Sequence, residues 1–200
     1  DDYDLILIET MTDLKELRAA LIGAKKAGRP VICSMSFEEN GYTFFGCSLE
    51  SFVVTAEALG ASAVGINCSL GSRKITPLAK RLQEVSPLPV FIKPNAGMPK
   101  TVNGKTIYDE SADEFEKAMR EIASFGIAML GGCCGTSPEY IRRVHRIERN
   151  CKIGGTFGGK LCCANRCVNA CGETLTVGER INPTGKPLLK RALADGDIDE

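Results

Sequence analysis

The sequence predicts an α/β fold around a parallel sheet, because short apolar runs alternate with amphipathic helical patterns over the first 150 residues. The runs begin about thirty residues apart, a spacing that fits one βα unit of a (β/α)8 barrel. Five runs occur, at residues 4–9, 31–37, 63–68, 90–95 and 128–133. A complete barrel needs eight units. We therefore expect a partial (β/α)8 barrel, about its last five units, with a smaller open sheet as the alternative.

Residues that commonly cap helices precede the helical patterns. The expected caps are Thr12, Ser48, Ser111 and Ser137. Glu114 follows the third of these caps by three residues, as in a capping box. Pro138 follows the fourth cap at the first helical position, where a missing N–H costs nothing. These signals predict helices between or after the apolar runs, as a chain of βα units requires.

Composition narrows the class of protein. The chain has 200 residues, 44% of them hydrophobic, and its 25 basic residues balance its 25 acidic ones. A net charge of zero argues against nucleic acid or an anionic membrane as the main partner. No apolar run has the length of a membrane span and no signal peptide is apparent, so we expect a cytoplasmic protein whose ten cysteines are mostly thiols. The chain opens directly on a strand-like run, which leads us to expect a fragment.

The amino-acid composition of the sequence changes after residue 150. Residues 151–176 are rich in Gly and Cys without a clear period, which is typical of a linker. Residues 177–200 then resemble one strand, a turn and a helix. We therefore expect three parts: the partial barrel at 1–150, a linker at 151–176, and the first βα unit of a second barrel at 177–200.

Chemically active side chains gather at the expected carboxyl ends of the strands, where parallel α/β folds place their active sites. The residues at these ends are Glu9, Phe37, Cys68, Asn95, Cys133 and Cys134, and the reactive groups among them are the three thiols, the carboxylate and the carboxamide. Three thiolates around one ion leave a fourth position open, the pattern of a catalytic zinc site. Buried structural cysteines are an equally weighted alternative on pattern alone.

Four motifs resemble the homocysteine S-methyltransferase family: ETM (9–11), GINCSLG (65–71), KPNAG (93–97) and GGCCGTSP (131–138). The resemblance covers residues 1 to about 150 and implies a methyltransferase. It implies that Cys68, Cys133 and Cys134 bind Zn²⁺ and that the sulfur of homocysteine takes the open position. It also implies that Glu9 holds the substrate's ammonium group. Asn95 is expected beside the metal. It is also a candidate metal ligand when substrate is absent.

The tail VGERINPTGK (177–186) is similar to the start of the methyltetrahydrofolate-binding barrel in cobalamin-dependent members of the family. This resemblance implies that Glu179, and less clearly Asn182, contact the pterin ring. It further implies that methylcobalamin, carried by a module not in this chain, is the methyl donor and is recharged from 5-methyltetrahydrofolate. The family's Asp-Gly-Ala-rich first motif is absent, so we expect no activity from the chain alone. The alternatives are a cobalamin-independent enzyme that uses betaine or S-methylmethionine, and a non-catalytic zinc-binding fragment.

Other reactive residues have simpler interpretations. Cys33 and Cys47 are expected in the core or on the surface. The cysteines at 163, 167 and 171 recur every four residues, unlike the C-x2-C of most metal motifs, so a second metal is the minor hypothesis there. His145 lies among arginines and is expected in solvent. Lys93 is interpreted either as a site residue or as a strand end.

Overall fold

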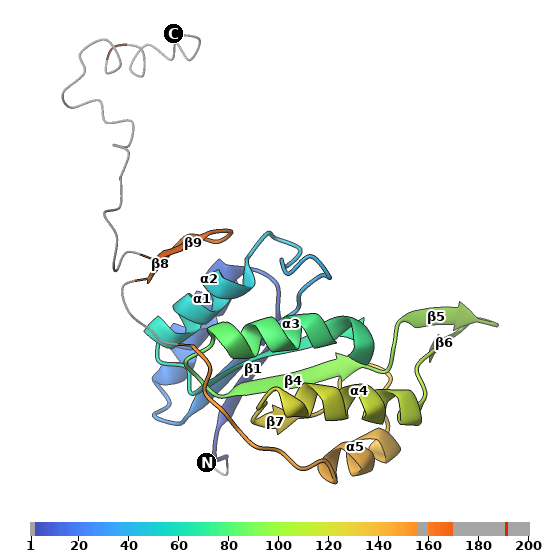
Figure 1. Ribbon diagram of the computed structural model, residues 1–200. Helices are drawn as coiled ribbons and strands as arrows, with labels where there is room; N and C mark the ends of the chain where they lie inside the picture. Colours follow the sequence, from blue (N-terminus) through green and yellow to red (C-terminus); the bar gives the residue numbers. More distant parts are fainter. Residues whose placement is uncertain (1–2, 156–159, 170–190, 192–200) are drawn as a thin grey trace.

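The computed structural model describes residues 3–155, 160–169 and 191, and its centre is a five-stranded parallel sheet in the order β1-β2-β3-β4-β7 (Figure 1). Its strands are β1 (Ile6–Met11), β2 (Val31–Met35), β3 (Ala63–Gly71), β4 (Val90–Asn95) and β7 (Met129–Leu130). The connecting helices are α1 (Leu14–Lys25), α2 (Leu49–Ala58), α3 (Ser72–Val85) and α4 (Ala112–Ser124), and α5 (Pro138–His145) follows β7. Because consecutive parallel strands are joined through helices, the predicted α/β fold is confirmed.

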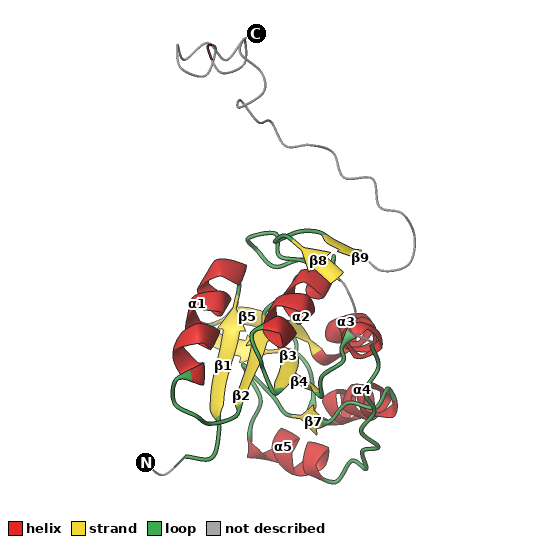
Figure 2. Cartoon of the chain, turned by 90° about the vertical axis from the view of Figure 1, so that its left-hand side faces the viewer, coloured by secondary structure: helices red, strands yellow, loops and turns green. Residues whose placement is uncertain are grey.

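The hydrophobic core lies between one face of the sheet and the helices that pack on it (Figure 2). Strand residues of one parity, such as Val31, Ile66 and Ile92, join Leu17 and Phe115 of the helices in this core. Since successive strand residues point to opposite faces, the residues between them form a second face. The second face carries more polar side chains and leads to the functional site.

The helix caps follow the predicted pattern with one correction. Ser48 and Ser111 cap α2 and α4 through their side chains, and Glu114 completes the capping box. Asp13, rather than the expected Thr12, caps α1, because its carboxylate accepts from the N–H groups of Lys15 and Glu16. Ser137 precedes α5 at the predicted position, but its side chain makes no capping bond.

Two hairpins lie outside the predicted alternation. The first joins β5 (Pro99–Val102) to β6 (Lys105–Tyr108) and projects beyond the carboxyl end of β4 (Figure 1). Its turn is Asn103–Gly104, and both residues have positive φ, as a two-residue hairpin turn requires. This Asn-Gly pair is the signal from which the hairpin was predictable.

Within the described residues, no helix combines the length and apolar character needed to cross a bilayer.

The second hairpin lies inside the segment expected to be a linker. It joins β8 (Lys160–Cys162) to β9 (Cys167–Asn169). The N–H of Ser48 donates to the carbonyl of Ala164 at 2.9 Å, which fastens the hairpin to the start of α2. This part of residues 151–176 is therefore packed against the domain. The domain boundaries stay a prediction, because most of the tail lies outside the described residues.

Candidate metal centre

Cys68 lies in an irregular part of β3. The parallel register between β3 and β4 breaks between Asn67 and Gly71, and both Cys68 and Ser69 adopt positive φ, at 61° and 57°. Two consecutive non-glycine residues in this region are uncommon and cost free energy. The break turns the backbone where the pleat would otherwise continue, and it places the thiol of Cys68 near the carboxyl end of the sheet. The strand runs beyond its predicted end at Cys68.

Cys133 and Cys134 lie in the loop after β7, and the backbone of β4 holds this loop. The N–H of Cys133 donates to the carbonyl of Pro94 at 2.8 Å, and Ala96 donates to the carbonyl of Cys134 at 2.9 Å. Asn95 accepts the N–H of Cys134 through its side-chain Oδ1 at 3.1 Å. These bonds continue the β4–β7 pairing past the short strand β7. These hydrogen bonds hold both cysteines beside β4, although the loop that carries them is not a regular strand.

Gly135 shows why glycine follows the paired cysteines. Its φ is +80°, a conformation that residues with a Cβ rarely adopt, and a Cβ here would also overlap the ring of Tyr108. Tyr108 ends β6, so the hairpin β5–β6 packs directly on the loop that carries the cysteines. Burial, with smaller contributions from the neighbouring Cys134 and other thiols, raises the pKa of Tyr108. The hairpin therefore forms one wall of the site.

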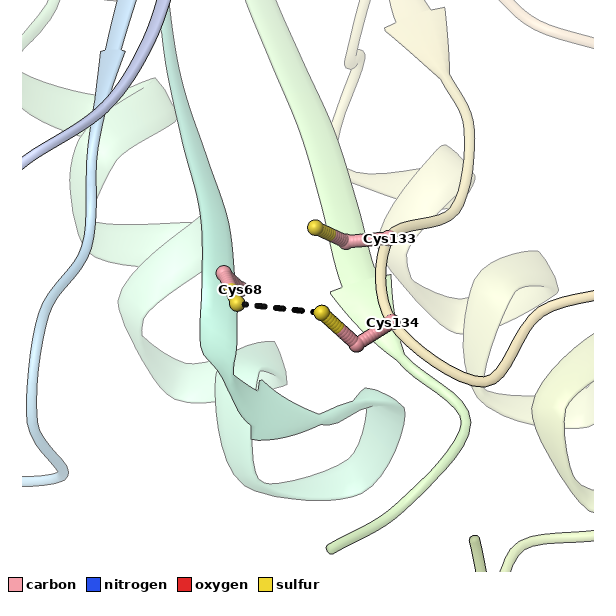
Figure 3. Close-up of side chains that lie close together, drawn as sticks. All are labelled: Cys68, Cys133 and Cys134. Atoms are coloured by element: carbon pink, nitrogen blue, oxygen red, sulfur yellow. Dashed lines mark hydrogen bonds between the residues drawn. The ribbon is translucent and has the colours of Figure 1, made fainter. Parts of the chain in front are cut away.

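The three thiols meet in one cluster (Figure 3). Each of the sulfur atoms of Cys68, Cys133 and Cys134 lies within 4.8 Å of the other two, and those of Cys68 and Cys134 are 3.7 Å apart. In a tetrahedral site with Zn–S bonds near 2.3 Å, the sulfurs are about 3.8 Å apart. The cluster thus fits a single zinc ion with a fourth position available. Among the described residues, it is the only such group of three or more His, Cys, Asp or Glu side chains.

The thiol of Cys68 favours its protonated form. Burial raises the pKa of Cys68 to about 11, and the nearby thiol of Cys133 acts in the same direction. Metal ligands are thiolates, so binding of a cation releases protons from the cluster. Cys68 and Cys133 are half-buried and Cys134 is exposed, so the cluster opens toward solvent rather than into the core.

Asn67, which the sequence reasoning missed, ties the cluster to the sheet. Its side chain is fully buried, and both its amide nitrogen and its amide oxygen make hydrogen bonds. Nδ2 donates to Oγ1 of Thr10 at 2.7 Å and approaches Sγ of Cys133 at 3.6 Å, while Oδ1 accepts from the N–H of Thr10 and from Oγ of Ser34 at 2.9 and 2.7 Å. A polar residue beside Cys68 in an apolar strand was the available signal.

The predicted substrate residues lie on the same side of the sheet as Asn67. Glu9 forms an ion pair with Lys93, which belongs to β4. Glu9 precedes the end of β1 by two residues, so its expected place at the strand end is only approximate. Asn95 is 4% exposed and directs its Oδ1 to the Cys134 N–H, which places it beside the cluster as expected. Metal ligation by Asn95 and ammonium binding by Glu9 stay predictions.

The other residues that the sequence analysis named lie outside this cluster or outside the described residues. Phe37, the strand-end residue without a reactive group, is wholly buried and packs against Phe52 in the core. Cys33 and Cys47 are buried thiols, as the first of their two interpretations expected. His145 is exposed, as expected. Glu179, Asn182 and Cys171 lie outside the described residues.

The fold and the cluster together define a parallel α/β domain with three thiols gathered at the carboxyl end of its sheet, at distances suited to one metal ion. The chain belongs to the homocysteine S-methyltransferase family, whose model matches residues 1–147. This membership confirms the resemblance carried by the four motifs.

Two curated relatives cover nearly the whole chain. Methionine synthase from Mycobacterium leprae is 29% identical over 211 residues, and methionine synthase from Mycobacterium tuberculosis is 31% identical over 208 residues. Each match covers 97% of this chain, but the chain spans only 18% and 17% of the two relatives.

Solved structures share the fold. The apo form of the homocysteine methyltransferase MmuM from Escherichia coli superposes with a TM-score of 0.59 at 21% identity, over 74% of this chain and 50% of that one. Its metallated form gives a TM-score of 0.58 at 22% identity, over 72% of this chain and 44% of that one. At this identity the likeness supports the α/β fold alone.

Proposed function

We propose that this chain carries the metal-binding half of a homocysteine methyltransferase site and takes part in methyl transfer to the thiol of homocysteine, which forms methionine. The observation that carries the proposal is the three-thiol cluster, with sulfurs spaced for one tetrahedral ion and an open side. Family membership and the names of the two curated relatives support the choice of reaction. The donor chemistry of three clustered thiols supports the choice of a soft metal ion.

Cys68, Cys133 and Cys134 would hold Zn²⁺, which when bound supplies a Lewis acid that keeps the substrate sulfur as a thiolate near neutral pH. Three thiolate ligands also leave that sulfur electron-rich, since they donate strongly to the ion. The chain's own contribution is positional. Asn67 and the β4 backbone orient the cysteines. Glu9, on β1 at the same side of the sheet, binds the ammonium group of the amino acid.

The finer parts of the proposal concern the rest of the reaction. The methionine synthase relatives match 97% of the chain, beyond the family match at 1–147, so the tail is similar to these relatives as well. The resemblance of residues 177–186 to a methyltetrahydrofolate-binding barrel supports a cobalamin-dependent enzyme. Methylcobalamin on a separate module of the same parent protein would then donate the methyl group and be recharged from 5-methyltetrahydrofolate. Residues 1–150 would belong to a (β/α)8 barrel, and Glu179 and Asn182 to the start of the pterin-binding domain.

A methyl-donor comparison tests this proposal. The gene product that carries this chain, loaded with zinc, is incubated with homocysteine and either methylcobalamin, betaine or S-methylmethionine, and methionine is measured. Methionine from methylcobalamin, lost in Cys134→Ala, is the expected result. Transfer only from betaine or S-methylmethionine would move the protein to the cobalamin-independent branch of the family. A zinc-loaded gene product that neither binds homocysteine nor accepts a methyl group from any donor would identify a non-catalytic zinc-binding protein.

A further inference from the structure

The hairpin β8–β9 places two cysteines directly opposite each other. Cys162 ends β8 and Cys167 begins β9, and the two residues are partners in the antiparallel register. The N–H of Cys163 donates to the carbonyl of Arg166 at 2.9 Å, so the next pair along the hairpin, Cys162 and Cys167, is a non-hydrogen-bonded one. The Cα atoms of such a pair lie about 4.5 Å apart, within the range of about 4.4–6.8 Å that a disulfide bridges. The backbone of the hairpin therefore brings the two thiols within reach of one covalent bond.

Both cysteine side chains lie on the face of the hairpin that packs on α2 (Figure 2). The sulfur of Cys162 is 3.6 Å from Oγ1 of Thr55 and 3.8 Å from the carbonyl oxygen of Ser51. Cys167 lines a cavity of about 210 Å³ that is lined also by Val54 of the same helix. These contacts place the two side chains together, as residues directly opposite on an antiparallel pair share one face.

The neighbouring thiols do not compete for this bond. Cys47 is 1% exposed, and burial, with a smaller contribution from Cys162, raises its pKa to about 12, so it stays a protonated thiol in the core. Cys163 is exposed, but it projects from the opposite face of the strand, with its sulfur 3.2 Å from Oδ1 of Asn165. Cys162 and Cys167 are half-buried, and Cys162 lines a second cavity of about 460 Å³ between the hairpin and helices α1 and α2. A small reagent therefore reaches this pair.

We propose that Cys162 and Cys167 are a thiol–disulfide exchange site, which reacts with small-molecule disulfides and thereby fastens the hairpin β8–β9 to the domain. The site is separate from the metal centre, because neither cysteine belongs to the cluster of Cys68, Cys133 and Cys134. The inference therefore does not depend on the proposed function, and a failure of one leaves the other in place.

The reaction proceeds in two exchange steps. The thiolate of one cysteine attacks a sulfur of the small-molecule disulfide, which breaks the S–S bond of the reagent, forms a mixed disulfide and releases one small thiol. The thiolate of the second cysteine attacks the protein sulfur of the mixed disulfide, which forms the bond between Cys162 and Cys167 and releases the second small thiol. Each protein sulfur loses one electron, each reagent sulfur gains one, and the two protons of the cysteines end on the two released thiols.

The bond tightens the attachment of the hairpin. A two-stranded hairpin is marginally stable on its own. This one is held by the hydrogen bond from the N–H of Ser48 to Ala164 and by the contacts of Cys162 with α2. The disulfide closes the loop between Cys162 and Cys167 and removes open conformations from the hairpin, so opening of the hairpin should become at least about tenfold rarer.

Peptide mapping of the oxidised gene product tests the site. The folded protein is treated with bis(2-hydroxyethyl) disulfide, remaining thiols are blocked, and the protein is digested with trypsin without reduction. Trypsin cleaves after Arg166 and so separates the two cysteines into peptides 161–166 and 167–180. Mass spectrometry should find these two peptides joined, and dithiothreitol should separate them. Hydrogen exchange of the amides at 161–168 should be at least about tenfold slower in the oxidised protein than in the reduced one.

Cysteine variants assign the bond within the joined peptides. Cys162→Ser and Cys167→Ser should lose the joined species, whereas Cys163→Ser and Cys171→Ser, the matched controls in the same two peptides, should retain it. Peptides that join only in urea, or not at all, would overturn the inference. Loss of the joined species in Cys163→Ser with retention in Cys162→Ser would overturn it equally, since the bond would then belong to another pair. Unchanged hydrogen exchange after complete oxidation would show that the bond does not fasten the hairpin.

Discussion

The sulfur atoms of Cys68 and Cys134 lie 3.7 Å apart although 66 positions separate the two residues in the chain. Neither cysteine lies in regular strand structure. Cys68 lies within a break in the β3–β4 register, and Cys134 follows β7 in a loop bonded to β4. The strand β4, which contributes none of the three thiols, is therefore the common reference for both cysteines, because its backbone and the side chain of Asn95 hold the loop that carries Cys134.

Removal of any one thiol is expected to abolish tight metal binding. Purified without chelator, the wild type should contain one zinc ion per chain, whereas Cys68→Ala, Cys133→Ala and Cys134→Ala should each contain little, because two thiolates leave the ion without its third protein ligand. Elemental analysis of the purified variants measures this directly. Cys151→Ala, which removes an exposed cysteine outside the cluster, should retain full zinc. Full zinc in Cys68→Ala would refute the assigned ligand set.

Asn67→Ala tests the link between sheet and metal. The substitution leaves the buried hydroxyl of Ser34 and the N–H of Thr10 without their shared acceptor, so the free energy of unfolding should fall by about 2–3 kcal/mol. Zinc affinity should also fall, since the contact to Cys133 is lost. Chemical denaturation and competition with a chelator measure the two effects. Asn150→Ala, at an exposed position outside the helices and strands, should change neither, and unaltered zinc affinity in Asn67→Ala would restrict Asn67 to a structural role.

Gly135→Ala tests the wall that the hairpin β5–β6 provides. Both Gly135 and Gly104 have positive φ, so alanine costs about 1–2 kcal/mol of stability at either position. Only at Gly135 would the new Cβ also overlap Tyr108, whereas at Gly104 it meets no atom within 4 Å. Thermal unfolding should therefore show a larger loss for Gly135→Ala, together with weaker zinc binding. Equal losses for the two variants would show that Tyr108 does not pack as described.

The sequence predicted the features that depend on local chemistry and on strand order. Apolar runs marked the five parallel strands, and the caps at Ser48 and Ser111 are in place. Three cysteines near strand ends meet because parallel strands bring their carboxyl ends to one edge.

Features that depend on tertiary packing were not predictable in this way. The positive φ of Cys68, the buried bonds of Asn67 and the pairing of Glu9 with Lys93 arise from contacts between distant strands. Helix α3 carries Pro77 in its interior and has no side-chain cap, so the usual start signals are missing there.

Glu9→Gln is expected to weaken binding of homocysteine while zinc content stays at the wild-type level. Glu9 lies on β1, apart from the three thiols, and its carboxylate already pairs with the ammonium group of Lys93. Glutamine keeps the shape but loses the charge, so the substrate ammonium loses a charge-assisted bond and affinity should fall by about tenfold or more.

A ligand without an ammonium group separates this effect from damage to the fold. Binding of 4-mercaptobutanoate, which keeps the thiol and the carboxylate, should not weaken in Glu9→Gln, because its complex never contained the bond that the substitution removes. Glu39→Gln is the control, since Glu39 pairs with Lys74 on the exposed surface and should leave both affinities unchanged. Titration of cobalt-loaded protein measures each affinity, and elemental analysis measures zinc. Loss of zinc in Glu9→Gln with unchanged affinity for homocysteine would reverse the assignment and place Glu9 with the metal rather than with the amino acid.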